Sequence, residues 1–295
     1  HQGLKKREMT KKNHPSVGVG LPVYNNGRYL SKTLDSIVNQ SYKNLIIYIS
    51  DDCSHDDTQA ICERYAAKDE RIRYSRNERN LGTNRNHAKI LSLASTEYFM
   101  FARGHEILSL NLVEDCLRTL QENGESVLSF ATTQWIDEQD NPMPNKPIAY
   151  FDTRGLDVVK RAALVFWGNW ECFYGLARTE LLKRIRGHEE IIGNDTVSLL
   201  EKALLGSFAH VGSATRYRRY HYTGESYATR MRRYQSQNYR QLNAIDKVFP
   251  LARLPYHLLR SVLKSELRSV DKLKILFVVL SNAPLRYIVS KGKQL

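Results

Sequence analysis

The sequence predicts an α/β fold with a mixed, mostly parallel sheet and flanking helices. Short runs of β-branched and aromatic residues alternate with amphipathic stretches between residues 16 and 102, and a polar loop follows most of the runs. Strands that alternate with helices form parallel βαβ units. After this part comes a strongly basic C-terminal region with a helical pattern, which we expect to form a helical extension.

The first half of the chain defines its elements most clearly. The predicted strands cover residues 17–21, 45–50, 71–75 and 98–102, and the predicted helices between them cover 28–39, 57–67 and 84–94. Later patterns predict helices at 109–123 and 196–206, strands at 126–131, 173–177 and 209–214, and a loop rich in Pro, Asn and Asp at 137–147. Ligands bind at the carboxyl ends of parallel strands, so the loops that follow the strands should form the site.

Length and composition are those of a folded domain with an appendage. The chain has 295 residues, of which 42% are hydrophobic and 25% charged, so it can bury a large core and is too apolar to be intrinsically disordered. The four cysteines form no CxxC pair, which favours reduced thiols and a cytoplasmic location. The longest apolar run, 275–280, is too short to cross a bilayer. We expect a tag-like lead-in at 1–14, a main domain at 15–221 and a basic, mainly helical extension at 222–295.

Three polar motifs carry a family resemblance. They are PVYNNGRYLSKTLDSIVNQSY from Pro22, IYISDDCSHDDT from Ile47 and NLGTNRNHA from Asn80. In this order and spacing they resemble family 2 of the inverting glycosyltransferases, over residues 16–221. The resemblance implies the Rossmann-like GT-A fold. It also implies transfer of a sugar, with inversion, from a nucleotide-diphosphate donor such as a UDP-sugar to a saccharide or lipid-linked acceptor, in surface polysaccharide or glycan synthesis.

The same resemblance assigns a nucleotide-binding site. It implies that Asp52 accepts a hydrogen bond from the base and that residues 22–25, with Pro22, Tyr24 and Asn25, form the opposite wall. It places Asn80 and Arg85 at the border of the nucleotide. The alternative for the Asp-rich segment at 51–57 is a helix N-cap, and Arg85 could equally be an ordinary surface residue.

The segment after the strand at 98–102 departs from the family pattern. Where the family has an Asp-x-Asp motif that holds Mg²⁺ or Mn²⁺ against the diphosphate, this chain has Arg103, Gly104, His105 and Glu106. His105 and Glu106 are still candidate ligands for Mn²⁺ or Mg²⁺. Arg103 is an alternative source of positive charge for the diphosphate. The third alternative is a non-catalytic nucleotide-sugar-binding or scaffolding protein.

Further candidate residues lie in the second half. Asp195, at the start of a predicted helix, aligns with the family's catalytic base, which takes the proton of the acceptor hydroxyl; a helix cap is the alternative. The resemblance also implies that Arg219 and His221 approach the diphosphate or its metal. Two tryptophans, Trp167 and Trp170, are candidates for a wall that stacks on the sugar acceptor, or for core residues.

The charge of the chain is concentrated at its C-terminal end. Residues 216–295 hold 17 of the 44 Lys and Arg residues but only 4 of the 31 Asp and Glu residues, so the whole net charge of +13 lies there. Two basic amphipathic helices predicted within 250–280 suit the inner face of an anionic membrane. Packing on the main domain or on a protein partner is the alternative. Nucleic acid is the least favoured partner, because the sequence has none of the usual recognition motifs.

Overall fold

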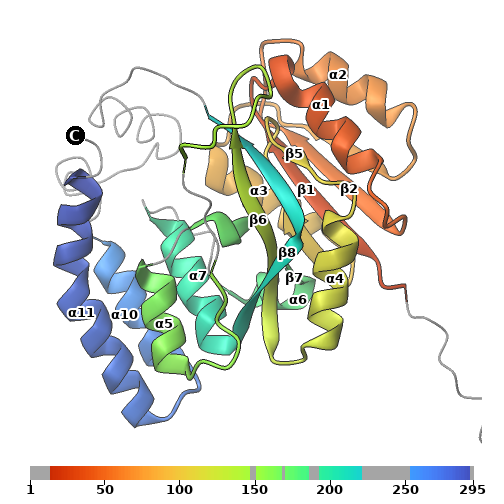
Figure 1. The fold of residues 1–295 in the computed structure, drawn as a ribbon. Coiled ribbons are helices and arrows are strands. Elements are labelled where there is room, and N and C mark those ends of the chain that lie inside the picture. Colours follow the sequence, from red (N-terminus) through yellow and green to blue (C-terminus); the bar gives the residue numbers. More distant parts are fainter. Residues whose placement is uncertain (1–13, 147–150, 168–169, 186–192, 221–252, 293–295) are drawn as a thin grey trace, which may run out of the picture.

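The fold is built on one mixed sheet. The computed structural model describes residues 14–146, 151–167, 170–185, 193–220 and 253–292, without the side chains of residue 170 and of 283–292. Eight strands in these residues follow the order β3-β2-β1-β4-β7-β6-β8-β5 (Figure 1). They are β1 (Val17–Val23), β2 (Leu45–Asp51), β3 (Ile72–Arg76), β4 (Tyr98–Phe101), β5 (Ile107–Leu108), β6 (Ser126–Ile136), β7 (Leu176–Arg178) and β8 (Ser207–Arg219).

The pairing confirms the predicted mixed, mostly parallel sheet. β1 lies parallel to both β2 and β4, and β2 lies parallel to β3. The short strand β7 runs antiparallel to its neighbours β4 and β6, while β6 and β8 are parallel. The first four strands therefore end at the same edge of the sheet, and the loops that follow them are neighbours.

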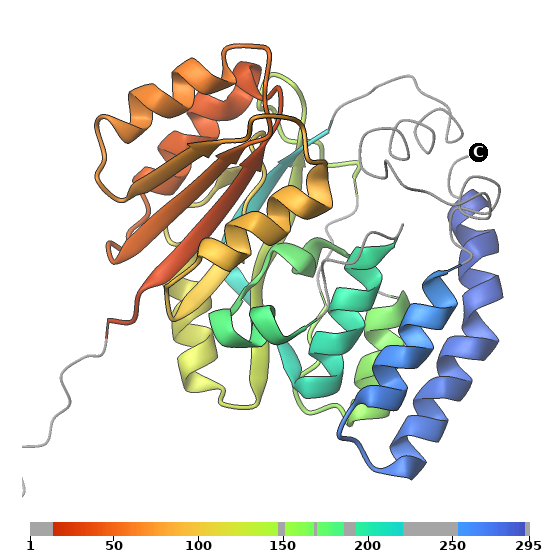
Figure 2. The ribbon, with the colours of Figure 1, turned by 180° about the vertical axis from the view of Figure 1, so that it is seen from behind.

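Helices cover both faces of the sheet. On one face lie α1 (Gly27–Val38), α2 (Thr58–Ala66) and α4 (Leu112–Glu122), as Figure 1 shows. The other face is covered by α3 (Thr83–Leu93), α6 (Thr179–Arg184) and α7 (Asn194–Leu205), as Figure 2 shows. Glycine at position 20 makes room for this second layer, because a Cβ there would lie 2.8 Å from Ile90 Cγ2 of α3. The central strands β1, β2 and β4 are buried on both faces, which explains their continuous apolar runs.

The second half of the chain differs in detail from the prediction. The strand predicted at 173–177 is instead a 3-10 helix, η1 (Trp170–Tyr174), followed by the short strand β7. The aromatic rings of Phe173 and Tyr174 pack into the interior instead of alternating between two faces: Phe173 stacks on Phe101 and Tyr174 lies beneath Arg103. Neither α5 (Val158–Trp167) nor α6 is among the predicted elements.

The predicted C-terminal helices are confirmed. α10 (Leu254–Lys264) and α11 (Ser269–Gly292) form a hairpin beside α5 and α7 (Figure 1). Leu258, Val262, Ile275 and Val279 are buried in one cluster with apolar residues of α5 and α7. No helix among the described residues is long and apolar enough to cross a membrane. The hairpin is therefore attached to α5 and α7 through a separate hydrophobic cluster.

Candidate functional site

The loops after β1 and β2 are fastened to each other. The backbone N–H of Asn25 donates to Ser54 Oγ at 2.9 Å, and Asn25 Oδ1 accepts from the N–H of His55 at 2.9 Å. Asn25 has a φ of 51°, a left-handed conformation that asparagine adopts more readily than most residues. The neighbouring Tyr24 is exposed at this edge, and Pro22 closes the end of β1. The proposed nucleotide wall at 22–25 is thus held rigidly against the loop that contains Asp52.

Asp52 fixes the next loop. Its carboxylate is only 3% exposed and accepts hydrogen bonds from Asn77 Nδ2 at 2.8 Å and from the N–H groups of Leu81 and Gly82 at 2.7 and 2.9 Å. Gly82 has a φ of 87°, which favours glycine at this turn. Asn80 Oδ1 also accepts from the Gly82 N–H at 3.0 Å. The carboxylate therefore shapes the turn before α3, next to the site predicted from sequence.

Arg85 lies at the start of α3, just beyond this turn. Its side chain is exposed, on the helix whose N-terminal residue follows Gly82. Helix N-termini and guanidinium groups both attract phosphate. Asn86, one residue on, is buried and donates to the carbonyl of Ser50 at 2.9 Å, which ties α3 to the end of β2.

The loop after β4 completes the edge. Gly104 lies so close to the β1 loop that a Cβ there would approach Asn26 Cγ to 2.9 Å. The Arg103 side chain is 27% exposed; its guanidinium lies 4.2 Å from the centroid of the Tyr174 ring and pairs with Glu106 at 3.1 Å. His105 is partly exposed. Arg103 is therefore the cation that this loop presents at the carboxyl end of β4.

Glu106 has an interior role instead of the predicted metal-binding one. Its side chain is fully buried, with one oxygen 3.1 Å from Arg103 Nη1 and the other 3.7 Å from Arg216 Nε. Burial alone would raise the pKa of this carboxyl, but the charges of Arg216 and Arg103 outweigh it and hold the pKa below its usual value. A carboxylate enclosed by two guanidinium groups does not fit a ligand for Mg²⁺ or Mn²⁺.

A metal site is not formed by the residues that the structure describes. In the described ranges no group of three or more His, Cys, Asp or Glu side chains is placed to hold an ion. His105 is the remaining candidate at this loop, since Glu106 faces the interior. His221 lies outside the described residues.

Arg219 also differs from its predicted role as a diphosphate clamp. Its side chain is fully buried at the end of β8, where it lies 4.2 Å from the centroid of the Tyr29 ring. It donates to the carbonyl of Asp137 at 2.7 Å and to that of His105 at 3.3 Å, and it pairs with Asp140. All of these contacts are internal, so Arg219 holds the β4 loop in place from below.

Asp195 lies in the first turn of α7, where its carboxylate accepts a hydrogen bond from the N–H of Thr196 at 2.9 Å. A carboxylate here is favoured by the helix dipole. Lys202 of the same helix lies 4.9 Å from the centroid of the Phe173 ring, so α7 packs on η1. Since Tyr174 of η1 packs on Arg103, this short helix links α7 with the end of β4.

The structure describes the side chain of one of the two candidate tryptophans, Trp167. Trp167 is on α5, and its Nε1–H donates to Asn282 Oδ1 of α11 at 3.2 Å, so this ring contributes to the contact between the two helices. This position does not suit the predicted stacking wall. The side chain of Trp170 lies outside the described part of the chain.

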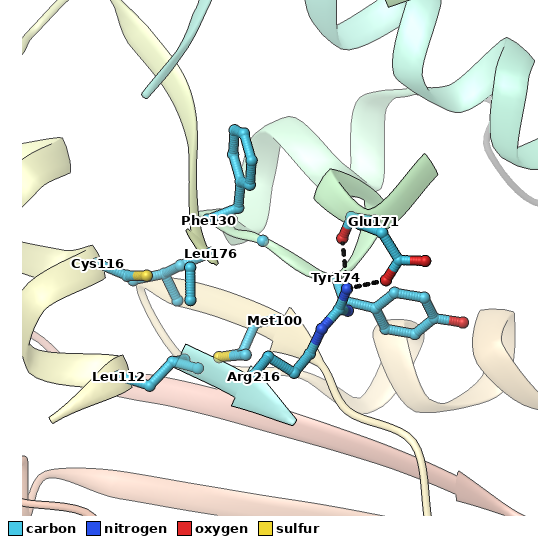
Figure 3. Close-up of a pocket in the computed structure, with 10 residues that line it drawn as sticks. Met100, Leu112, Cys116, Phe130, Glu171, Tyr174, Leu176 and Arg216 are labelled. Atoms are coloured by element: carbon cyan, nitrogen blue, oxygen red, sulfur yellow. Dashed lines mark hydrogen bonds and ion pairs between the residues drawn. The ribbon is translucent and has the colours of Figure 1, made fainter. Parts of the chain in front are cut away.

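A buried ion cluster beneath this edge was missed by sequence reasoning. Arg216 donates to Thr133 Oγ1 at 2.9 Å and to the carbonyl of Glu171 at 3.0 Å, and it also pairs with the Glu171 carboxylate. Arg218 contacts the same carboxylate. Figure 3 shows Arg216 directed at Glu171, with Tyr174 alongside, at a cavity of about 10 Å³. That volume holds about one water molecule, so the cavity is not a substrate site.

The family model Glycosyl transferase family 2 matches residues 19–180, more than half of the chain. The chain belongs to glycosyl transferase family 2. The match begins in β1 and ends in α6, so it contains the loops after β1, β2, β3 and β4. The predicted family is confirmed.

Relatives and solved structures agree with this family. The chain is 30% identical to glycosyltransferase GlyG of Streptococcus pneumoniae over 38% of its own length and 37% of that protein. It is 28% identical to the GalNAc(5)-diNAcBac-PP-undecaprenol beta-1,3-glucosyltransferase of Campylobacter jejuni over 61% of its length and 57% of that enzyme. The chain thus spans a little over a third to a little over half of the length of these two relatives.

The fold comparison confirms the GT-A architecture. The structure of S. aureus TarS 1–349 in complex with UDP-GlcNAc superposes with a TM-score of 0.68 at 18% identity, over 90% of this chain and 71% of that one. GalNAc-T7 with UDP, GalNAc and Mn²⁺ superposes with a TM-score of 0.54 at 14% identity, over 72% of this chain and 45% of that one. At identities this low, the two superpositions establish the shared fold alone.

Proposed function

We propose that this family 2 chain is an inverting glycosyltransferase that moves a hexose-type unit from a UDP-sugar to a saccharide or lipid-linked acceptor. The observation that carries the proposal is the arrangement of the site. The loops after β1, β2, β3 and β4 are bound to one another at one edge of the sheet, and η1 connects this edge to α7, the helix that contains Asp195. UDP-GlcNAc in the TarS structure and the undecaprenol-linked saccharide in the name of the Campylobacter relative support this choice of donor and acceptor.

The proposed chemistry assigns a separate task to each part of the edge. The base of the nucleotide lies between residues 22–25 and the Asp52 loop, and Arg85 and Arg103 provide positive charge for the diphosphate. Asp195 takes the proton of an acceptor hydroxyl as its oxygen bonds to the anomeric carbon. The bond from that carbon to the diphosphate oxygen breaks, and the electron pair leaves with the UDP. Attack from the face opposite the leaving group inverts the configuration.

The source of positive charge is a separate part of the proposal. A diphosphate leaving group has to be stabilised by cations, and Glu106 is unsuitable as a metal ligand because Arg103 and Arg216 enclose it. We assign the charge to Arg103, whose guanidinium is partly exposed at the end of β4. His105 is the candidate ligand if Mn²⁺ or Mg²⁺ contributes. Measuring the nucleotide affinity once in the presence of Mn²⁺ and once in the presence of a chelator separates the two sources of charge.

One observation favours a second function. The Asp-x-Asp motif is replaced, and its last position, Glu106, has an internal role. A non-catalytic nucleotide-sugar-binding protein would have such a site. Release of UDP from a UDP-sugar distinguishes the two functions, because the binding protein would retain the donor intact while the enzyme hydrolyses it slowly even without an acceptor.

Asp52→Ala should weaken binding of UDP by about 1–3 kcal/mol. The substitution removes the proposed acceptor for the base and leaves the N–H groups of Leu81 and Gly82 without their partner, so the turn that borders the nucleotide loosens. Titration calorimetry with UDP measures the change. Asp69→Ala is the matched control, since that carboxylate precedes β3 at the opposite edge of the sheet and pairs with Arg71. Equal affinities for wild type and Asp52→Ala would remove Asp52 from the nucleotide site.

A further inference from the structure

Helix α11 has apolar residues on two opposite faces. Ile275 and Val279 face inward and are buried against α5 and α7. The outward face bears a second row, spaced by three or four residues so that its members lie on one side of the helix. These outward residues are 57–72% exposed: Val270, Leu273, Phe277 and Leu280. We call them the outer stripe.

The outer stripe has no cover in the part of the chain that the structure describes. α11 is the outermost helix of its layer in both views of the ribbon, with α10 and α5 between it and the sheet (Figures 1 and 2). A surface helix normally has one apolar face, which is buried, and polar residues on the opposite face, so a second apolar row is unusual. Contiguous exposed apolar side chains of this size mark a surface that binds a partner or a membrane.

The charges around the outer stripe identify its partner. Basic residues outnumber acidic ones in the hairpin: Arg253, Arg260, Lys264, Arg268, Lys272 and Lys274 stand against Glu266 and Asp271. The Arg268 side chain is 85% exposed although its Nε pairs with Asp271 at 2.9 Å, and Lys274 is exposed one position after Leu273. The whole net charge of +13 lies in residues 216–295. An apolar row flanked by cations matches a bilayer surface with anionic headgroups.

We propose that the outer stripe of α11 docks this protein on an anionic membrane surface. The helix lies in the plane of the surface, with the side chains of the outer stripe among the acyl chains and with Arg268 and Lys274 at the level of the lipid phosphates. A second copy of the chain is a poorer occupant. Two hairpins packed stripe to stripe would bring like charges together, and four side chains provide much less than the area of a typical protein interface.

Docking fixes the candidate site relative to the membrane. α10 and α11 share a core with α7, and Leu254 of α10 packs on Gly193, directly before α7, with Asp195 two residues beyond that glycine. This consequence rests on the proposed function: Asp195, the catalytic base, would then be held on the same side as the membrane in which a lipid-linked sugar acceptor is anchored. The docking itself does not depend on the proposed function.

Co-sedimentation of the full chain with vesicles tests the proposal. We expect the wild type to bind phosphatidylcholine vesicles that contain about one third phosphatidylglycerol, at low ionic strength, and to bind less as salt is added. Leu273→Gln with Phe277→Gln should lower the partition coefficient on the order of 10- to 100-fold, because two buried apolar side chains are lost. Arg268→Gln with Lys274→Gln should lower it roughly fivefold per charge, on the anionic vesicles alone.

The control variant is Leu93→Gln with Leu110→Gln, which replaces two exposed leucines of the sheet domain and should bind vesicles as the wild type does. Unchanged melting temperatures show that all variants are folded, as expected for exposed positions. Failure of the full chain to bind anionic vesicles at low salt would overturn the proposal. A Leu273→Gln/Phe277→Gln variant that binds like the wild type would also overturn it. A loss of dimer in light scattering with no change in vesicle binding would identify a second copy as the occupant.

Discussion

Asp195→Asn should lower turnover by roughly 10²- to 10⁴-fold while leaving nucleotide affinity nearly unchanged. Asparagine has the size of aspartate and still accepts a hydrogen bond from the N–H of Thr196, so the first turn of α7 keeps this local contact. It cannot take the proton of an acceptor hydroxyl. The measurement is the rate of sugar transfer, or of donor hydrolysis if the acceptor is unknown, together with UDP titration of the same preparation.

The control for this substitution is Asp157→Asn. Asp157 also accepts hydrogen bonds from N–H groups at the start of a helix, those of Val159 and Lys160, but it directly precedes α5 and is not part of the candidate site. We expect it to retain full turnover. If Asp195→Asn and Asp157→Asn were equally active, Asp195 would be a helix cap and the non-catalytic function would be the better proposal.

Glu106→Ala should lower the free energy of unfolding by about 3–5 kcal/mol, because it leaves two guanidinium groups near the interior without their shared anion. Arg103 and Arg216 both lie within 4 Å of this carboxylate, and its side chain is fully buried. Urea denaturation measures the effect. Glu138→Ala is the matched control: its ion pair with Arg28 is exposed, so the change should stay below about 1 kcal/mol.

The pH dependence of stability has a definite sign at this cluster. The pKa of Glu106 is lower in the folded protein than in the unfolded chain, so the folded state binds fewer protons at this group. Its contribution to stability is present above the unfolded value of roughly 4.3 and is lost as the pH falls through the folded value. Glu106→Gln should lack this acid-dependent loss. A Glu106→Ala variant as stable as Glu138→Ala would mean that Glu171 and the Tyr174 ring are sufficient to stabilise the two arginines.

The sequence predicts the first half of the fold well because each element there has a strong local pattern. β1 and β2 are continuous apolar runs, and α1 buries Leu30, Leu34 and Ile37 at helical spacing. The carboxyl ends of parallel strands meet at one edge, so the positions of the loops at 22–25 and 52 follow from topology. The helix hairpin at the C-terminal end is predicted for the same reason, by its periodic leucines and valines.

The parts that were not predicted are decided by long-range contacts. η1 and β7 are short, and packing of Phe173 and Tyr174 against the β4 region determines their conformation. Sequence alone gives no sign that Arg219 is buried while Arg218, next to it, is partly exposed. Glu171 lies in an aromatic segment with no motif, and only the fold brings it to Arg216 from 45 residues away.

Long-range contacts also decide which side chains of the loop after β4 are exposed. Replacement of the Asp-x-Asp motif is visible in the sequence, and it predicts an altered metal site, an arginine in its place or a non-catalytic site. Which of these side chains is exposed depends on the residues that pack against the loop. Arg216, whose buried position the sequence does not predict, pairs with Glu106 in the interior. Arg103 lies at the edge of the sheet and packs on the Tyr174 ring.

The most direct test of the central claim, that the edge formed by β1, β2, β3 and β4 binds a nucleoside diphosphate donor, is the melting temperature of the full chain with UDP. Ligand that binds the folded state raises this temperature by mass action. We expect UDP to raise it more than uridine does, to do so in the presence of a chelator because Arg103 supplies the charge, and to do so much less in Asp52→Ala. No shift with UDP, or with any other nucleoside diphosphate, with or without Mn²⁺, would contradict the account.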